Sequence, residues 1–386
     1  MQHYTPASHF PLALRPYSNS CSTAEVVKMP TTKVAVLDDY QELSKPHFDQ
    51  LQGDKYQVTI FTDTLPPYNH PDTPQDAKNA LVKRLEPFEV ICTMRERTPF
   101  PGDLVSRLPN LKLLLTTGPR NASLDVKAFS DRDIPVAGTV GEKKSPDSTT
   151  QHTVALILGL ARNLAHDDKV MKSGGWQTQV NTGLSGKVFG TVGLGRLGSA
   201  TARIMHLAFG MRVHAWSSNL TQEAADETAK AAGLPVEDAN GEKTFQVVSR
   251  EELFSQSDVV SIHIVLSERS RGLVNKDDLN KMKKSALLIN TSRGPIVNDD
   301  HLLEAAKNGA IRGVAVDVYE VEPLPKQSEW RTTNWGENGR SHVLLTPHMG
   351  YVEGEPVSNW YKQQVDNIVR WEKGEPLETV YKDSGY

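Results

Sequence analysis

Cysteine is nearly absent from this chain of 386 residues, which contains only Cys21 and Cys92. Two cysteines without a Cys-x-x-Cys pair or a Cys/His ligand pattern argue against a disulfide framework and against a structural zinc site. Long apolar runs are also missing, since no stretch reaches the roughly 18 residues that a membrane-spanning helix needs. The sequence therefore predicts a globular protein of a reducing, intracellular setting, with no metal centre and no membrane partner.

A strong excess of charge of one sign is lacking as well. The chain has 43 Lys and Arg against 47 Asp and Glu, for a net charge of −4. Its basic residues are dispersed, so the clustered positive charge of a nucleic-acid-binding protein is missing. A hydrophobic content of 38% with 23% charged residues is typical of globular proteins, and this length suffices for about two domains.

The first 30 residues differ in composition from the rest. They are rich in Ser, Pro, Thr and His, and their only full charges are Arg15, Glu25 and Lys28. We expect a disordered tail at residues 1–30. Scarce acids and abundant Ser are typical of transit peptides, but those peptides are also Arg-rich and amphipathic, and this stretch is neither. We therefore expect a cytoplasmic protein, with mitochondrial import left open as the alternative.

The most informative feature that is present is a glycine-rich turn, Gly193-Leu194-Gly195-Arg196-Leu197-Gly198. It follows an apolar strand pattern at 187–192 and precedes a helical pattern at 199–205. In a dinucleotide-binding unit the first glycine permits the tight turn, the second lets the pyrophosphate approach the backbone, and the third lets helix and strand pack closely. Free N–H groups at the helix start then face the phosphates. We predict that Gly193, Gly195, Arg196, Leu197 and Gly198 bind a dinucleotide.

Strand and helix patterns alternate along the rest of the chain, which predicts mainly parallel sheets. We expect strands at 33–37, 56–61, 89–93, 111–115, 134–137, 187–192, 212–216, 258–262, 286–290, 313–316 and 343–346, and helices at 77–85, 149–164, 299–308 and 356–371. The fold class is therefore α/β, with two doubly wound parallel-sheet domains. Residues 31–149 form the first, residues 150–350 form the dinucleotide domain, and residues 351–386 return to the first.

Ser217, Ser218 and Asn219 directly follow the predicted strand at 212–216 and are expected to meet the adenosine ribose. A Rossmann unit usually carries an acid there, which binds the ribose hydroxyls of NAD. An acid would repel the 2′-phosphate of NADP, and its absence removes that repulsion. The sequence therefore favours NADP(H) slightly, and NAD(H) stays open because no Arg follows directly.

Three residues of distinct chemistry, Arg293, Glu322 and His348, each follow a predicted strand of the dinucleotide domain. Ligands bind beyond the carboxyl ends of such strands. Arg can hold an α-keto acid by its oxygens, His can exchange a proton near neutral pH, and a neighbouring Glu stabilises the imidazolium. Alone, each has an ordinary reading as a surface arginine, a solvated loop acid or one of 12 histidines. Together they predict a catalytic centre.

Four motifs resemble those of the D-isomer-specific 2-hydroxyacid dehydrogenase family, whose members include glycerate, hydroxypyruvate and phosphoglycerate dehydrogenases. They are GLGRLG at 193–198, NTSRGPIVNDDHLLEAAKNG at 290–309, GVAVDVYEVEPLP at 313–325 and TPHMGY at 346–351. The resemblance covers about residues 33–375. It implies a Rossmann NAD(P)-binding domain inserted in a flavodoxin-like substrate domain, a cleft between them, and a homodimer formed through the nucleotide domains.

The resemblance also implies a reaction, which is reversible hydride transfer between NAD(P)H and a small 2-keto acid or D-2-hydroxy acid such as glyoxylate or hydroxypyruvate. Arg293 resembles the substrate-binding arginine, Glu322 its acid partner and His348 the general acid/base. Asp317 resembles the aspartate that holds the nicotinamide carboxamide. Thr291 and Gly350 resemble cofactor contacts. The segments 94–98 and 117–118 match places where the family meets the substrate carboxylate, and Arg95, Thr117 and Gly118 are the substrate contacts expected there.

Two other functions stay open. A formate dehydrogenase of this family needs no proton transfer from its substrate and carries Gln in the place of Glu322, so the acid argues against it. A nucleotide-sensing, corepressor-like binding protein can retain the Arg, Glu and His, but the missing ribose acid and the lack of an obvious peptide-binding extension favour an enzyme. The polar insertion at 326–341 is either a surface loop or part of a pocket lid. We expect its Trp330 and Trp335 to pack on the surface, with selection of bulky acids as the alternative.

Overall fold

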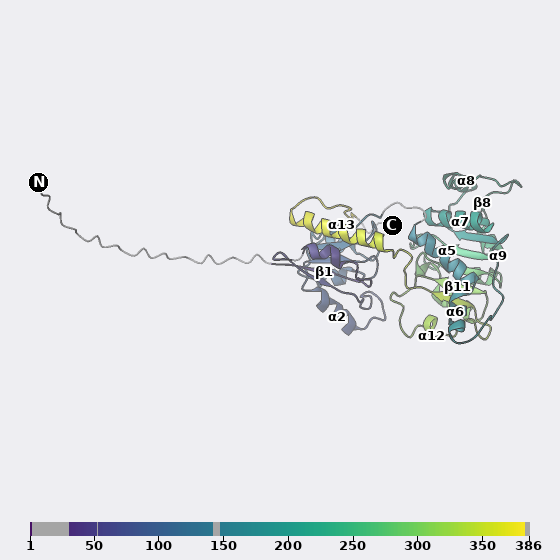
Figure 1. Ribbon diagram of the computed structural model, residues 1–386, viewed down its shortest axis with the longest axis horizontal. Helices are drawn as coiled ribbons and strands as arrows, with labels where there is room; N and C mark the ends of the chain where they lie inside the picture. The colour runs from purple at the N-terminus through teal and green to yellow at the C-terminus, as the bar shows by residue number, and fades with distance from the viewer. Residues whose placement is uncertain (2–30, 52, 142–146, 383–386) are drawn as a thin grey trace.

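The computed structural model describes residues 1, 31–51, 53–141 and 147–382. Apart from Met1, the predicted disordered tail lies outside the described residues. Figure 1 shows two α/β lobes next to one another, with helix α13 over the first lobe and helices α5 and α7 in the second. Within the described part of the chain, no helix has the length and apolar character that crossing a membrane requires.

The first lobe is built on a five-stranded parallel sheet in the order β2-β1-β3-β4-β5. Its strands are β1 (Thr32–Val36), β2 (Tyr56–Ile60), β3 (Val90–Thr93), β4 (Leu113–Thr116) and β5 (Val136–Ala137). Its helices are α1 (Lys45–Phe48), η1 (Asp49–Leu51), α2 (Gln75–Leu85), α3 (Gly102–Ser106), α4 (Val126–Ser130) and α13 (Gly354–Glu372). This strand order is that of flavodoxin-like sheets, so the expected fold of this lobe is confirmed.

The second lobe is built on a seven-stranded parallel sheet in the order β12-β11-β10-β9-β6-β7-β8. Its strands are β6 (Val188–Val192), β7 (Arg212–Trp216), β8 (Phe245–Val247), β9 (Val259–Ile262), β10 (Leu287–Asn290), β11 (Gly313–Val316) and β12 (His342–Leu345). Its helices are α5 (Ser148–Ala161), α6 (Leu164–Lys172), α7 (Arg196–Phe209), α8 (Gln222–Ala231), α9 (Arg250–Gln256), α10 (Lys276–Lys281), η2 (Gly294–Ile296), α11 (Asp299–Lys307) and α12 (Glu329–Thr332). The six strands from β8 to β11 have the Rossmann order, so the direction of winding reverses between β6 and β9.

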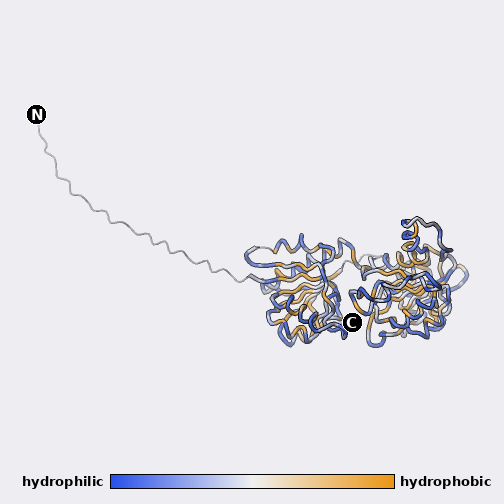
Figure 2. The backbone as a smooth tube through the Cα atoms, turned by 90° about the horizontal axis from the view of Figure 1, so that it is seen from below, coloured by the Kyte–Doolittle hydropathy of each residue, from blue (hydrophilic) through white to orange (hydrophobic). Residues whose placement is uncertain are grey.

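Each sheet is covered on both faces. Successive residues of a strand point to opposite sides, so one strand contributes to the apolar cluster on each face. In β4, Leu114 packs with the helices on one face, while Leu113 and Leu115 join the cluster that includes Tyr361 of α13. Ile289 and Leu288 of β10 divide in the same way between two clusters in the second lobe. Figure 2 shows the result as apolar segments that run through the interior of each lobe, with polar segments around them. Both lobes are therefore doubly wound.

The last helix crosses back to the first lobe. Helix α13 packs on α1 and on β4, and Tyr361 donates a hydrogen bond from its hydroxyl to Asp39 at 3.1 Å. The chain beyond it also stays there, since the Tyr381 hydroxyl donates to the carbonyl of Gly118 at 2.9 Å. The two connections between the lobes thus precede α5 and follow β12, which places the loop of His348 at one of them.

Some expectations from the sequence need correction. Strand β8 was not expected, because three residues at the edge of a sheet leave no long apolar pattern. The expectation that Trp330 packs on the surface is wrong. Its side chain is 2% exposed in the core of the second lobe, it donates to Asp299 at 2.9 Å, and its ring lies 5.5 Å from that of Trp335. The insertion therefore contributes to the core of its own lobe.

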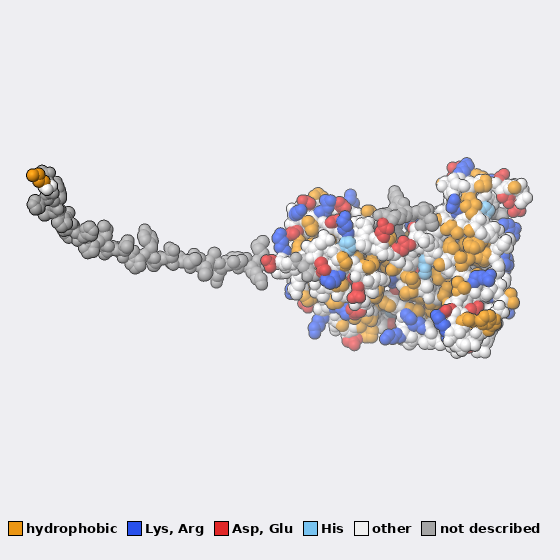
Figure 3. Space-filling model, in the orientation of Figure 1, with side chains coloured by type: hydrophobic (Ala, Val, Ile, Leu, Met, Phe, Trp, Pro, Cys, Tyr) orange, Lys and Arg blue, Asp and Glu red, His pale blue; other side chains and the backbone are white. Residues whose placement is uncertain are grey.

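Charges are mixed over the surface. Figure 3 shows acidic and basic side chains interspersed on the visible face of both lobes. Many ion pairs among the described residues join neighbouring side chains of this surface, such as Lys45 with Asp49 at 2.8 Å and Lys172 with Asp168 at 2.7 Å. Exposed pairs of this kind contribute only about 0.5 kcal/mol each. The charges that matter for function lie between the lobes.

Candidate active site

The glycine turn has the geometry that its sequence predicts. Gly193 leaves β6 with a φ of +100°, which a residue with a side chain rarely adopts. A Cβ on Gly198 would lie 2.1 Å from the carbonyl oxygen of Gly193, so only glycine permits this contact of helix and strand. A Cβ on Gly195 would meet nothing within 4 Å, which leaves open space over the turn. Helix α7 begins there without a side-chain cap, so its first N–H groups can bind phosphate.

The predicted ribose contacts lie at the end of β7, which is paired with β6. Ser217 is partly buried, whereas Ser218 and Asn219 are exposed. Nearby, the guanidinium of Arg250 lies 5.6 Å from the centre of the Trp216 ring. Arg250 also forms a two-point contact with Asp278, at 2.9 and 2.7 Å. The carboxyl end of β7 thus carries hydroxyl and amide groups, and these groups are expected to meet the ribose.

Two other predicted cofactor residues have partners within the protein. Arg196 is 75% exposed and forms an ion pair with Asp147, the N-cap of α5. Thr291 is buried at the end of β10, and its hydroxyl lies 2.8 Å from that of Thr153 on α5. Arg196 and Thr291 therefore both contact the N-terminal half of α5, close to where the cofactor is expected.

His348 and Glu322 are in direct contact. Nδ1 of His348 lies 2.5 Å from Oε2 of Glu322, and Oε1 of the same carboxylate accepts a hydrogen bond from the backbone N–H of Tyr319 at 2.9 Å. The backbone of His348 has a φ of +51°, so the loop after β12 turns sharply at this residue. With Nδ1 held by the carboxylate, Nε2 is the nitrogen that can face a substrate.

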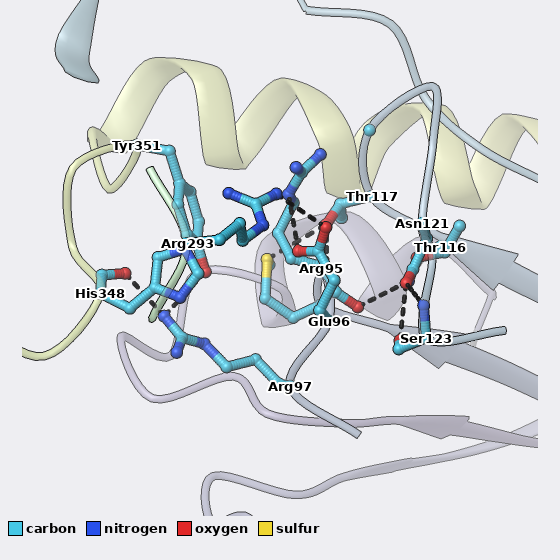
Figure 4. A network of polar contacts seen from close by, with 12 residues as sticks. Arg95, Glu96, Arg97, Thr116, Thr117, Asn121, Ser123, Arg293, His348 and Tyr351 are labelled. Atoms are coloured by element: carbon cyan, nitrogen blue, oxygen red, sulfur yellow. Dashed lines mark hydrogen bonds and ion pairs between the residues drawn. The ribbon is translucent and has the colours of Figure 1, made fainter. Parts of the chain in front are cut away.

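Arg97 connects the two lobes at this pair. It comes from the loop after β3, and its Nη1 donates to Oε2 of Glu322 at 3.3 Å. Its Nη2 donates to the backbone carbonyl of His348 at 2.7 Å and to the hydroxyl of Tyr351 at 3.2 Å. A single guanidinium from the first lobe therefore contacts the side chain of Glu322 and the backbone of His348. Figure 4 shows Arg97 beside His348 and Tyr351.

Arg293 also reaches across the cleft. Its Nη2 donates to Oε1 of Glu96 at 2.9 Å, while Nε of Arg95 lies 3.6 Å from Oε2 of the same carboxylate. Burial alone would raise the pKa of Glu96, but the charges of Arg95, Arg293 and His348 outweigh it and hold that pKa well below its usual range. Three cationic or protonatable groups thus converge on one ionised carboxylate, as Figure 4 shows for the two arginines.

The predicted substrate contacts of the first lobe lie together. The backbone N–H of Arg95 donates to the hydroxyl of Thr117 at 2.9 Å. The Arg95 guanidinium lies over Gly118, where a Cβ would be 1.9 Å from its Nη1. Gly118 has a φ of +89°, and its N–H donates to Thr139 at 2.8 Å. A side chain at position 118 would displace the guanidinium of Arg95 and would have to adopt a positive φ, so glycine suits this position.

Asp317 holds the loop of the catalytic histidine candidate. It is 1% exposed, and its Oδ1 accepts hydrogen bonds from the Thr346 hydroxyl at 2.7 Å and the Met349 N–H at 2.9 Å. Its Oδ2 accepts from the N–H of Gly350 at 3.0 Å, and Nε2 of His152 lies 3.3 Å from Oδ1. These contacts give Asp317 and Gly350 a role in fixing the loop, and their contact with a cofactor stays a prediction.

The same contacts set the acidity of Asp317. Burial would raise its pKa, but hydrogen bonds from His152, Thr346 and the Met349 N–H outweigh burial and lower the pKa to about 2. A carboxyl whose pKa is lower in the folded than in the unfolded state stabilises the fold above its unfolded pKa near 4. That contribution, about 2 kcal/mol, is lost as the pH falls from about 4 through 2.

Replacing Asp317 with asparagine should therefore lower the free energy of unfolding by about 2 kcal/mol at pH 7, since the amide cannot accept the same set of donors. The difference from wild type should shrink as the pH falls from about 4 to 2. Urea denaturation at several pH values measures both. Asp168→Asn, at an exposed pair with Lys172, is the matched control. Equal losses in the two variants would contradict the role of Asp317.

Several residues of this site were not singled out from the sequence. Glu96 and Arg97 lie in the segment 94–98, which the family resemblance places at the substrate carboxylate, but the sequence predicted no partner for either. His152 carried no such signal, since it lies within a helix whose other residues are largely apolar. Which partner each residue meets depends on segments about 200 residues away.

Comparison with known proteins agrees with this geometry. The sequence pattern of "D-isomer specific 2-hydroxyacid dehydrogenase, NAD binding domain" matches residues 154–350. The chain is 27% identical to a hydroxypyruvate reductase of Blautia hydrogenotrophica over 78% of this chain and 88% of the relative. It is 30% identical to a glyoxylate reductase of Thermococcus litoralis over 85% of this chain and 91% of the relative. The crystal structure of a phosphoglycerate oxidoreductase from Vibrio cholerae is 32% identical and superposes with a TM-score of 0.74, covering 89% of this chain and all of that one.

Proposed function

The chain belongs to the D-isomer specific 2-hydroxyacid dehydrogenase family and is an NAD(P)-dependent oxidoreductase, and from this premise we propose that it reduces 2-keto acids to D-2-hydroxy acids with His348 as the acid and Arg293 as the anchor. The observation that carries the proposal is the contact of 2.5 Å between Nδ1 of His348 and Glu322. Glyoxylate and hydroxypyruvate are the substrates in the names of two relatives, and both are 2-keto acids.

The residues of the glycine turn fit a nicotinamide dinucleotide. The open space over Gly195 and the uncapped start of α7 suit a pyrophosphate, and Ser217 and Asn219 can bond to the ribose. When bound, the cofactor supplies or accepts a hydride at its nicotinamide ring. We propose NADP(H) as the preferred form, because Ser217, Ser218 and Asn219 place no acid against a 2′-phosphate.

The chain's own residues divide the remaining work. Arg293 binds the substrate carboxylate through its planar fork and stabilises negative charge on the neighbouring oxygen. His348, protonated, gives the proton on Nε2 to the alkoxide that forms at C2, and accepts it back in the reverse direction. Glu322 holds Nδ1, which fixes the ring and stabilises the imidazolium. Arg97 fixes the position of the His348–Glu322 pair relative to the first lobe through its contacts with both residues.

Neither of the other two functions is favoured. A formate dehydrogenase has no use for the proton donor that the Glu322–His348 contact creates. A nucleotide-sensing binding protein stays distinguishable by a single property, which is turnover. The relatives named above are two reductases and an oxidoreductase. Their names favour an enzyme over a binding protein.

A homodimer is part of the proposal. Four large apolar side chains, Leu164, Met171, Trp176 and Val180, are exposed within one short segment of the second lobe. Apolar side chains that gather on a surface are typical of protein–protein contacts. The segment belongs to the nucleotide domain, through which members of this family are expected to pair.

A keto-acid panel tests the proposal. We expect oxidation of NADPH or NADH with at least one of glyoxylate, hydroxypyruvate, pyruvate, 4-methyl-2-oxopentanoate and phenylpyruvate, followed at 340 nm with both cofactors. No turnover with any of them, together with tight cofactor binding, would favour the sensor instead. A preference of more than about tenfold for NADH in kcat/KM would reject the NADP(H) proposal while leaving the reaction intact.

A further inference from the structure

A cavity of about 510 Å³ lies between the lobes, and His348 is one of the residues that line it. Tyr40 and Met94 come from the first lobe, Leu324 comes from the second, and Val352 lies in the connection between β12 and α13. The described residues that line it include Glu322 and His348 and do not include Arg293 or any residue of the glycine turn. The cavity is therefore part of the reacting centre and separate from the expected cofactor face.

The geometry of a 2-keto acid decides which of its groups can enter this cavity. C2 carries a carboxylate, an oxygen and a side chain in one plane. The carboxylate is expected at Arg293 and the oxygen toward Nε2 of His348, so the side chain projects away from Arg293. The cavity adjoins His348 but not Arg293. It therefore lies where the side chain of the substrate is expected.

The wall of the cavity is mainly apolar. Ten of its sixteen lining residues are aliphatic or aromatic, and the charged groups among them are engaged with the protein. Two nitrogens of Arg97 bond to Glu322, to the His348 carbonyl and to Tyr351. At the other end, Nε and Nη2 of Arg331 both donate to the carbonyl of Leu324, at 3.2 and 3.1 Å. The wall therefore offers mainly apolar surface, and the positive charge of Arg331 remains beside it because a backbone carbonyl is neutral.

We propose that this cavity binds the substrate side chain and selects bulky apolar 2-keto acids, branched-chain or aromatic, over glyoxylate and hydroxypyruvate. The inference rests on the proposed function and narrows its substrate class. Glyoxylate has no side chain and leaves the cavity to water, whereas a volume of this size is within the range of pockets that bury small organic ligands. Each methylene buried in an apolar pocket changes discrimination by about 10- to 200-fold.

The insertion at 326–341 takes part in this selection through Arg331. Its tryptophans pack in the core of the second lobe, and this anchors α12, whose Arg331 lines the cavity. Arg331 in turn holds the backbone of Leu324, whose side chain lines the wall. A substitution at Leu324 changes the side chain in the cavity and keeps the carbonyl that Arg331 needs.

Steady-state kinetics on the full-length chain test the proposal. For wild type, kcat/KM for 4-methyl-2-oxopentanoate or phenylpyruvate should exceed that for glyoxylate by at least about a hundredfold. Leu324→Trp and Val352→Trp should each fill part of the cavity and lower this ratio by at least about tenfold. Leu207→Trp introduces the same side chain at an exposed position of α7 and should keep the wild-type ratio.

Each outcome decides something. Turnover of several keto acids with glyoxylate or hydroxypyruvate preferred would overturn the substrate class and leave the proposed function standing. A preference for 3-phosphohydroxypyruvate would show that the cavity receives an anion, which also overturns it. A bulky preference that both Trp variants retain would place the side chain elsewhere. No turnover with any keto acid would remove the proposed function and this inference together.

Discussion

Replacing His348 with glutamine should lower kcat by at least about a hundredfold, the usual scale for the loss of a general acid. Glutamine approximates the shape of the ring and can still bond to Glu322, but it cannot give up a proton to an alkoxide. Cofactor affinity should stay close to wild type, because the predicted cofactor contacts lie on the glycine turn and at the end of β7. The change therefore belongs in kcat, and pre-steady-state and steady-state assays with the best keto acid measure it.

The control is His166→Gln, at a partly buried histidine of α6 whose ring lies 6.1 Å from that of His342. It should leave kcat within about threefold of wild type, as surface substitutions away from a site do. Glu322→Gln in the His348→Gln background should cost little more than the single change, since the two residues act as one unit. Near-normal turnover of His348→Gln would end its role as the acid.

The fold was predictable from the sequence where its rules are local. Gly193 and Gly198 stand where backbone conformation and a close contact exclude a side chain, and such requirements appear directly in the sequence. Apolar runs such as Leu287–Asn290 mark strands that are buried on both faces. Strand β8 escaped because it depends on pairing with β7 at the sheet edge and not on its own composition.

The site was predictable as a set of residues but not as a set of contacts. Residues that follow parallel strands must meet at one edge of the sheet, so Arg293, Glu322 and His348 could be grouped from their positions alone. Their partners from the first lobe could not be assigned. The contacts of Glu96 with Arg293 and of Arg97 with Glu322 join residues that are 197 and 225 positions apart. No local pattern encodes such pairings, which depend on how the lobes pack.

The Glu96 contact changes how the arginine is understood. Nη2 of Arg293 donates to the carboxylate of Glu96 from the opposite lobe at 2.9 Å, and Nη1 donates to the backbone carbonyl of Ser292 at 2.8 Å. A substrate carboxylate that binds Arg293 is therefore expected to compete with Glu96 for this guanidinium, and Arg95 lies 3.6 Å from the same Glu96 carboxylate. The net energy of substrate binding is then expected to be smaller than that of the new contact alone.

Replacing Arg293 with alanine should lower kcat/KM by about 10²- to 10³-fold, the scale for loss of a positioned donor at developing negative charge. Both kcat and KM should change, because the guanidinium binds the carboxylate and also stabilises the reacting oxygen. Arg293→Lys keeps the charge without the planar fork, so it should recover only part of the loss. Steady-state kinetics of the three proteins, with and without added guanidinium chloride at low concentration, measure this.

A loss of kcat/KM in Arg293→Ala could also arise because the charge of Glu96 is left without the Arg293 guanidinium. A second substitution separates this effect from the loss of the substrate anchor. In Arg293→Ala the partly buried carboxylate of Glu96 loses its contact of 2.9 Å with Nη2 of Arg293, while Nε of Arg95 lies 3.6 Å away, so this variant should also destabilise the fold. Adding Glu96→Gln removes that charge and should restore the melting temperature. It should not restore kcat/KM, because the substrate still lacks its anchor. Recovery of both quantities in the double variant would mean that Arg293 serves the fold and not the reaction.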